Sequence, residues 1–298
     1  FGLGSFKALG GTYGGFQVIH HALKKEIGDE VSMKDIHAGK YSEQISKYTV
    51  TTATDGNHGR SVAFGAKLFG CKCQIYIHSE VSSGRQKAME DLEATVNRIS
   101  GNYDASLQIC IEDAGKNNWH VISDTSYEGY TKYPRYIMAG YNVMAEEIID
   151  QIKDRPLPTH VFLQGGVGSF PGAICGYFWE KFPGNNIKFV VVESEHAPCL
   201  IRSAQNNQMT SVSIKQETMM AGLSCGEPSL LGWEILKSGT DDFITINDSS
   251  IPGLMRLLAK NNLKIEAGES SVAGLAGLIE SMEDQKIAEA MELDKESI

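Results

Sequence analysis

The chain has 298 residues, of which 42% are hydrophobic and 21% are charged, and its formal net charge is −10. This composition is ordinary for a globular protein, and the length allows one large or two moderate domains. The negative charge argues against binding to nucleic acid or to an anionic membrane, because both select basic surfaces. No apolar run approaches the roughly 18 residues of a membrane span, and we see no signal-peptide pattern.

The six cysteines are scattered along the chain and indicate no metal site. Cys71 and Cys73 do not have the spacing of a zinc-ligand pair, and no second pair follows. Buried free thiols are therefore the simpler interpretation. Together with the absence of a signal-peptide pattern, this predicts a cytoplasmic protein.

Predicted strands and helices alternate through the first half of the chain. It opens with a predicted helix over residues 5–27, whose glycine pairs indicate close approach by a ligand or by another helix. Strands are predicted at residues 48–52, 73–78, 95–99 and 120–123, and helices over 60–70, 83–92, 103–116 and 134–152. This alternation predicts a parallel sheet with right-handed crossovers.

A second alternating set begins after the proline-containing linker at residues 154–158. Strands are predicted at residues 159–163, 188–193 and 243–246, and helices from 173 and over 200–204, 231–237, 251–259 and 271–282. The strand over 188–193 is uninterrupted by polar residues from Phe189 until its end at Glu193, as expected when helices cover both faces of a sheet. We also expect further chain beyond both ends, because Phe1 lies inside a motif and the last residues stop where another strand usually follows.

The stretch from Thr51 to Gly59 predicts part of a binding site. A β-branched strand turns there through two glycines into a helix, which leaves backbone N–H groups able to hold an anion such as a carboxylate. Asp55 in this turn would repel that anion, so the pattern favours a substrate with both a carboxylate and a cationic amine. The alternative for Asp55 is a helix N-cap.

Three other segments carry candidate chemistry. Residues 165–169 follow a strand and precede a helix, a phosphate-binding pattern whose alternative is a tight turn. Asp124 ends a strand at the sheet edge where α/β sites lie. Lys7 lies in a glycine-rich, apolar setting, which would lower the lysine pKa and free the amine. His58 is more simply interpreted as a structural hydrogen-bonding residue than as a base.

Several of these segments together resemble a known family. They are residues 1–11 (FGLGSFKALGG), 52–60 (TATDGNHGR), 124–132 (DTSYEGYTK), 220–228 (MAGLSCGEP) and 268–270 (GES), with the glycine loop at 165–169. They resemble the fold type II pyridoxal-phosphate enzymes, the superfamily of tryptophan synthase β and threonine dehydratase, and within it the diaminopropionate ammonia-lyases. The resemblance runs across essentially the whole chain. Relative to that family, we expect the chain to lack an N-terminal segment and the C-terminal strand and loop that carry the Ser or Thr facing the pyridine nitrogen.

The resemblance implies a fold and a domain division. The fold is α/β, with two parallel-sheet domains and the cofactor, pyridoxal 5'-phosphate, between them. The smaller domain would cover residues 48–145, and the larger, cofactor-binding domain would cover 1–47 and 146–298. The resemblance also implies a homodimer.

The resemblance further assigns roles to individual residues. Lys7 would bind the cofactor covalently, with Phe6 beside it, and Asn57 would hydrogen-bond the 3-hydroxyl oxygen. Lys7, Asp55 and Asp124 would be the catalytic residues. The other cofactor-binding residues would be Gly165, Gly166, Val167, Gly168 and Ser169 at the phosphate, and Gly222 and Glu269 near the ring.

The implied reaction is α,β-elimination of 2,3-diaminopropionate to pyruvate and ammonia. The leaving group of this substrate is an ammonium, which two carboxylates would bind, whereas a serine hydroxyl would gain nothing from them. Two carboxylates in one pocket also repel each other, which raises at least one pKa and makes that group a usable base. The alternatives are a serine/threonine dehydratase, which would lack the acidic pair, and a non-catalytic fragment that binds pyridoxal phosphate.

Overall fold

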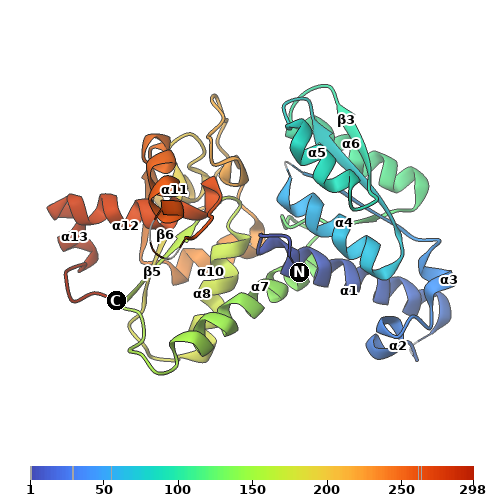
Figure 1. Ribbon diagram of the computed structural model, residues 1–298, viewed down its shortest axis with the longest axis horizontal. Helices are drawn as coiled ribbons and strands as arrows, with labels where there is room; N and C mark the ends of the chain where they lie inside the picture. The colour runs from blue at the N-terminus through green and yellow to red at the C-terminus, as the bar shows by residue number, and fades with distance from the viewer. Residues whose placement is uncertain (1, 29, 55, 261, 263) are drawn as a thin grey trace. The chain divides into compact units, whose positions relative to one another are not determined.

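The computed structural model describes residues 2–28, 30–54, 56–260, 262 and 264–298. The chain forms two compact units, Phe1–Val143 and Met144–Ile298, each built on its own parallel sheet (Figure 1). The predicted α/β class is confirmed in both units. Within the described residues, no helix is both long enough and apolar enough to cross a membrane.

The first unit contains a four-stranded sheet in the order β3-β2-β1-β4, with every pairing parallel. Its strands are β1 (Thr49–Ala53), β2 (Lys72–His78), β3 (Thr95–Ile99) and β4 (His120–Val121). Its helices are α1 (Lys7–Ile27), α2 (Met33–His37), α3 (Ser42–Ile45), α4 (Asn57–Phe69), α5 (Ser83–Glu90), α6 (Tyr103–Asn117) and the first part of α7 (Lys132–Ile152). All five residues of β1 are buried, as its position between two other strands requires.

The second unit contains a three-stranded parallel sheet in the order β5-β6-β7. Its strands are β5 (His160–Gln164), β6 (Lys188–Ser194) and β7 (Asp242–Ile246). Its helices are α8 (Ser169–Lys181), α9 (Cys199–Asn206), α10 (Leu230–Gly239), α11 (Ile251–Lys260), α12 (Ala273–Glu283) and α13 (Gln285–Met291), with 3-10 turns η1 (Ala221–Leu223), η2 (Asp248–Ser250) and η3 (Glu269–Val272).

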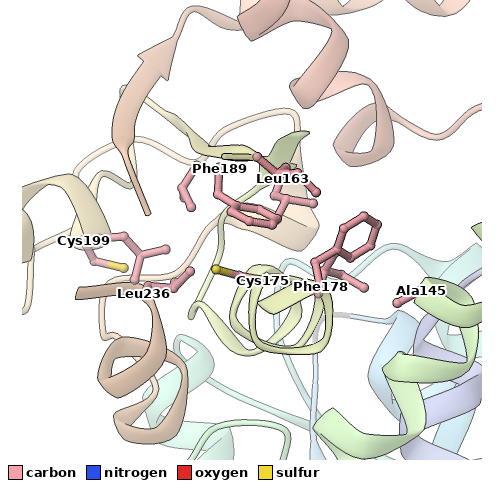
Figure 2. Packing of buried hydrophobic residues seen from close by; sticks show 11 residues of the cluster. Ala145, Leu163, Cys175, Phe178, Phe189, Cys199 and Leu236 are labelled. Atoms are coloured by element: carbon pink, nitrogen blue, oxygen red, sulfur yellow. The ribbon is translucent and has the colours of Figure 1, made fainter. Parts of the chain in front are cut away.

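Strand β6 serves two separate hydrophobic cores. Phe189 and Val191 pack with side chains of α8, α9 and α10, and Figure 2 shows Phe189 among Leu163, Cys175 and Phe178. The alternate residues of β6, Val190 and Val192, belong to a second core with α11, α12 and α13. Because successive side chains of a strand point to opposite faces, a strand that is covered on both faces has an apolar centre, as residues 189–192 of β6 do.

The glycines of α1 lie where other helices approach. A Cβ on Gly10 would lie 2.3 Å from Cε1 of Tyr141, and one on Gly140 would lie 2.7 Å from Cα of Gly10, so the backbones of α1 and α7 approach each other directly at these two glycines. On the other side, α1 packs along α4 (Figure 1). Close approach by another helix, one of the two predicted possibilities, is therefore confirmed for α1.

Replacing Gly140 by alanine should destabilise the first unit. The added methyl group meets backbone atoms of α1, and overpacking of this kind costs about 1–3 kcal/mol. The control is Gly115→Ala in α6, where no atom lies within 4 Å of the new Cβ; there the better helix propensity of alanine should stabilise by up to about 1 kcal/mol. Denaturant unfolding of the two variants gives both values. Equal effects would show that α1 and α7 tolerate a wider separation.

The start of one predicted helix next to the glycine loop differs from the structure. Helix α8 begins at Ser169 rather than near residue 173, because proline at position 171 is tolerated in a first helical turn, where its missing N–H has no intrahelical partner. Residues 1–47 lie by contact in the first unit, together with residues 48–143. Their grouping with a larger domain, which rests on the resemblance, stays a prediction.

Candidate active site

Thr54 shapes the turn between β1 and α4. Its hydroxyl oxygen accepts hydrogen bonds from the backbone N–H groups of Gly56 and Gly59, each at 3.0 Å. Gly59 is the third residue of α4, so its N–H is one that an N-capping side chain would accept. Thr54 therefore accepts the N–H of Gly59, which is the capping role that the sequence left open for Asp55. Asp55 itself lies outside the described residues, and Asn57 is the exposed first residue of α4.

The amine of Lys7 lies against the carboxylate of Asp124. Nζ of Lys7 forms an ion pair with Oδ2 of Asp124, and the two side chains are 22% and 14% exposed. Lys7 is the first residue of α1, and its carbonyl accepts a hydrogen bond of 2.6 Å from the hydroxyl of Ser61 in α4. The fold thus brings together two of the predicted catalytic residues, 117 positions apart in the chain.

Asp124 is held in its ionised form. Burial alone would raise its pKa, but the charges of His58 and Lys7 outweigh burial and hold the pKa well below its usual range. Nδ1 of His58 is 3.7 Å from Oδ2 of Asp124. Nε2 of His58 donates to the carbonyl of Ile122 at 2.9 Å, which is the structural hydrogen bond expected of this residue. A partly buried carboxylate of this kind attracts a cation but is a weak base.

Two aromatic rings lie beside Lys7. The Phe6 ring centroid is 5.9 Å from Nζ of Lys7 and 5.0 Å from the ring centroid of Tyr141, which it meets edge to face. Tyr141 is buried, and burial together with the charge of Asp124 outweighs Lys7 and raises its pKa. We therefore expect Tyr141 to stay neutral. Sequence reasoning missed Tyr141 and Ser61, because neither lies in a recognisable motif.

The loop from Gly165 to Ser169 joins β5 to α8. The N–H of Gly165 donates to Val192 in the sheet, and the carbonyl of Val167 accepts from Ser229. In the described part of the chain, the N–H groups of Gly166, Val167 and Gly168 donate to no protein acceptor. They lie immediately before α8, whose N-terminal dipole adds partial positive charge. These donors are suited to bind an anion such as a phosphate.

Glycine is required within this loop for two reasons. Gly168 has φ +96°, in the left-handed region. A Cβ on Gly166 would lie 3.2 Å from the carbonyl oxygen of Gly222, so this predicted ring-contacting residue lies beside the loop. The N–H of Gly222 in turn donates to Oγ of Ser270 at 3.2 Å, and Ser270 follows Glu269 in η3. The structure therefore places Gly222 beside the loop and the start of η3 beside Gly222.

Each unit, taken by itself, has a group of the kind that pyridoxal phosphate requires. The first unit offers a partly buried lysine amine, and the second offers an anion site made of backbone N–H groups. A phosphate would satisfy these N–H donors without a cationic side chain. Lysine, in turn, is the residue that binds this cofactor covalently.

Comparison with known proteins defines the class. The family model described as "Pyridoxal-phosphate dependent enzyme" matches residues 3–293. The chain therefore belongs to the pyridoxal-phosphate dependent enzyme family; it has the fold type II architecture, and its cofactor is pyridoxal phosphate.

Its relatives include diaminopropionate ammonia-lyase of Escherichia coli K12, which is 35% identical over 306 residues that cover 100% of this chain and 75% of that protein. The crystal structure of the selenomethionine-containing holo enzyme from Escherichia coli matches with a TM-score of 0.87 at 34% identity, again covering 100% and 75% of the two chains. The same enzyme in complex with an aminoacrylate-PLP azomethine reaction intermediate matches with a TM-score of 0.86 at the same identity and coverage.

Proposed function

We propose that this protein catalyses the pyridoxal-phosphate-dependent α,β-elimination of 2,3-diaminopropionate, which with one water gives pyruvate and two molecules of ammonia. The observation that carries the proposal is the ion pair of Lys7 and Asp124. Asp124 is ionised and already holds an amine, so it is suited to bind the β-ammonium of this substrate. The similarity to diaminopropionate ammonia-lyase along the whole chain supports the same substrate.

Each predicted residue has a role in this proposal. Pyridoxal phosphate, when bound, stores the electron pair left on the α-carbon as the α-proton departs. Lys7 would hold the cofactor and take the α-proton of one enantiomer, and Asp55 would take it from the other. Asp124, a poor base because of its low pKa, would hold the leaving ammonium.

The remaining predicted residues would bind the cofactor. Asn57 would hydrogen-bond the 3-hydroxyl oxygen, and Phe6, Gly222 and Glu269 would contact the ring. The phosphate would be held by the loop residues Gly165, Gly166, Val167, Gly168 and Ser169.

A substrate comparison tests the proposal. Pyruvate release should be much faster from 2,3-diaminopropionate than from serine of either configuration, because only the former has a β-ammonium for Asp124 to bind. Faster release from serine would favour the dehydratase alternative. Cofactor binding without release from any substrate would favour a non-catalytic protein.

We also propose that the protein is a homodimer and acts in the cytoplasm. Light scattering of the purified protein tests the first statement, and fractionation of cells that produce it tests the second. A mass of about 32.5 kDa, that of one chain, would contradict the dimer.

Gly168→Asp should lower the affinity of the cofactor-free protein for pyridoxal phosphate by about 100-fold, because it places a carboxylate beside the phosphate. The new side chain would also approach Leu200 and Leu236, which lie 3.1 and 3.2 Å from the Cβ position, so some loss of stability is expected. Gly253→Asp in α11, where no atom lies within 4 Å of the new Cβ, is the control. Unchanged affinity in a folded Gly168→Asp variant would show that the loop is only a turn.

A further inference from the structure

Glu193 is a buried carboxylate for which the proposed reaction has no use. It lies in β6 and is fully buried. Its two oxygens accept hydrogen bonds from the N–H groups of Leu200 at 2.8 Å and Ile201 at 2.7 Å, the second and third residues of α9. Burial raises the pKa of Glu193 to about 8, although these backbone hydrogen bonds lower it. Both oxygens of this buried carboxyl group are therefore used to hold the first turn of α9.

The first turn of α9 lies directly behind the phosphate-binding loop. A Cβ on Gly165 would lie 3.0 Å from Cδ1 of Leu200. A Cβ on Gly168 would lie 3.1 Å from Cδ2 of the same leucine. The thiol of Cys199 donates to the carbonyl of Gly166 at 3.5 Å. Three loop residues are therefore in contact with the turn that Glu193 holds.

We propose that Glu193 is a positioning residue for the cofactor phosphate: it fixes the first turn of α9, and this turn holds the Gly165–Gly168 loop in its phosphate-binding conformation. A glycine-rich loop has wide conformational freedom, so its N–H groups stay aligned only if neighbouring groups restrain them. The inference rests on the proposal that the phosphate binds this loop.

The test is Glu193→Gln with two forms of the cofactor. Glutamine keeps the shape, but its single acceptor oxygen can serve only one of the two N–H groups, and its NH₂ group faces the other. The affinity of the cofactor-free protein for pyridoxal phosphate should fall about tenfold. The affinity for pyridoxal, which has no phosphate, should stay unchanged. Titration monitored by the absorption of the lysine-bound cofactor gives both constants.

Asp284→Asn is the matched control. Asp284 also accepts two backbone N–H groups, those of Lys286 at 2.9 Å and Ile287 at 3.3 Å, at the start of α13. This variant should keep the wild-type ratio of the two affinities. The inference would be overturned if folded Glu193→Gln kept the wild-type ratio of the affinities for pyridoxal phosphate and pyridoxal, whether both affinities stayed the same or both fell equally. If Gly168→Asp also left the affinity unchanged, the loop assignment itself would be wrong.

A measurement on the wild-type protein avoids any failure of the variant to fold. Coupling between two sites is reciprocal, so inorganic phosphate bound at the loop should slow hydrogen exchange at the amides of Leu200 and Ile201. Protection of Gly166 and Gly168 without any change at these two amides would contradict the proposed role of Glu193.

Discussion

Lys7→Ala should abolish both pyruvate release and the yellow absorption of the lysine-bound cofactor. The variant has no amine at the position that pairs with Asp124, so the covalent attachment and one of the two proposed bases are lost together. Pyruvate release and the absorption spectrum after addition of pyridoxal phosphate measure the two effects.

Lys132→Ala is the control for this experiment. Lys132 also lies near an aromatic ring, with Nζ 5.9 Å from the ring centroid of Tyr133, and it belongs to one of the resembling motifs. Its replacement should leave the absorption intact. Borohydride reduction followed by peptide mapping identifies the attached lysine directly, and a label on any lysine other than Lys7 would contradict the assignment.

Asp55→Asn should separate the two enantiomers of 2,3-diaminopropionate. Asparagine keeps the size of the side chain but cannot accept a proton as a base, and loss of general-base catalysis is typically worth a factor of about 10² to 10⁴. Turnover of the D-enantiomer should fall by this factor, whereas the L-enantiomer, served by Lys7, should lose less. Pyruvate release from each enantiomer provides the comparison.

Cofactor binding is the internal control for Asp55→Asn, because Asn57 and the phosphate loop are unchanged. Equal losses on both enantiomers would reduce Asp55 to a group that binds ammonium. No loss on either would leave it without a catalytic role, in a turn where Thr54 already accepts the N–H of Gly59.

The sequence predicted the regular elements well where a local pattern exists. The β-branched or apolar runs of β1 and β6 and the glycine loop before α8 are signals of a few adjacent residues. The short helices α2, α3 and α13 were missed, because helices of four to seven residues show too little periodicity. The start of α8 was placed late, because proline and glycine at 171 and 172 look like loop residues.

The site was predictable only in part, for a physical reason. Lys7 and the glycine loop lie in continuous motifs, whereas Tyr141 and Glu193 matter because of what packs around them. The burial of Glu193 depends on β6 and α9 meeting, a contact between segments that no local pattern describes. The one sequence signal for Glu193 is a charged residue directly after the apolar run of residues 189–192.

The packing of α1 through glycines bears on how such an enzyme can diversify. Lys7 begins a helix that contacts α7 through bare backbone at Gly10 and Gly140, and that Ser61 holds at its first turn. Such a helix cannot slide or rotate to suit a new substrate without steric clashes. New substrate preferences should therefore arise by exchange of side chains in surrounding loops, such as residues 124–131, while the reactive amine stays in place. A library designed to change the substrate should leave α1 untouched.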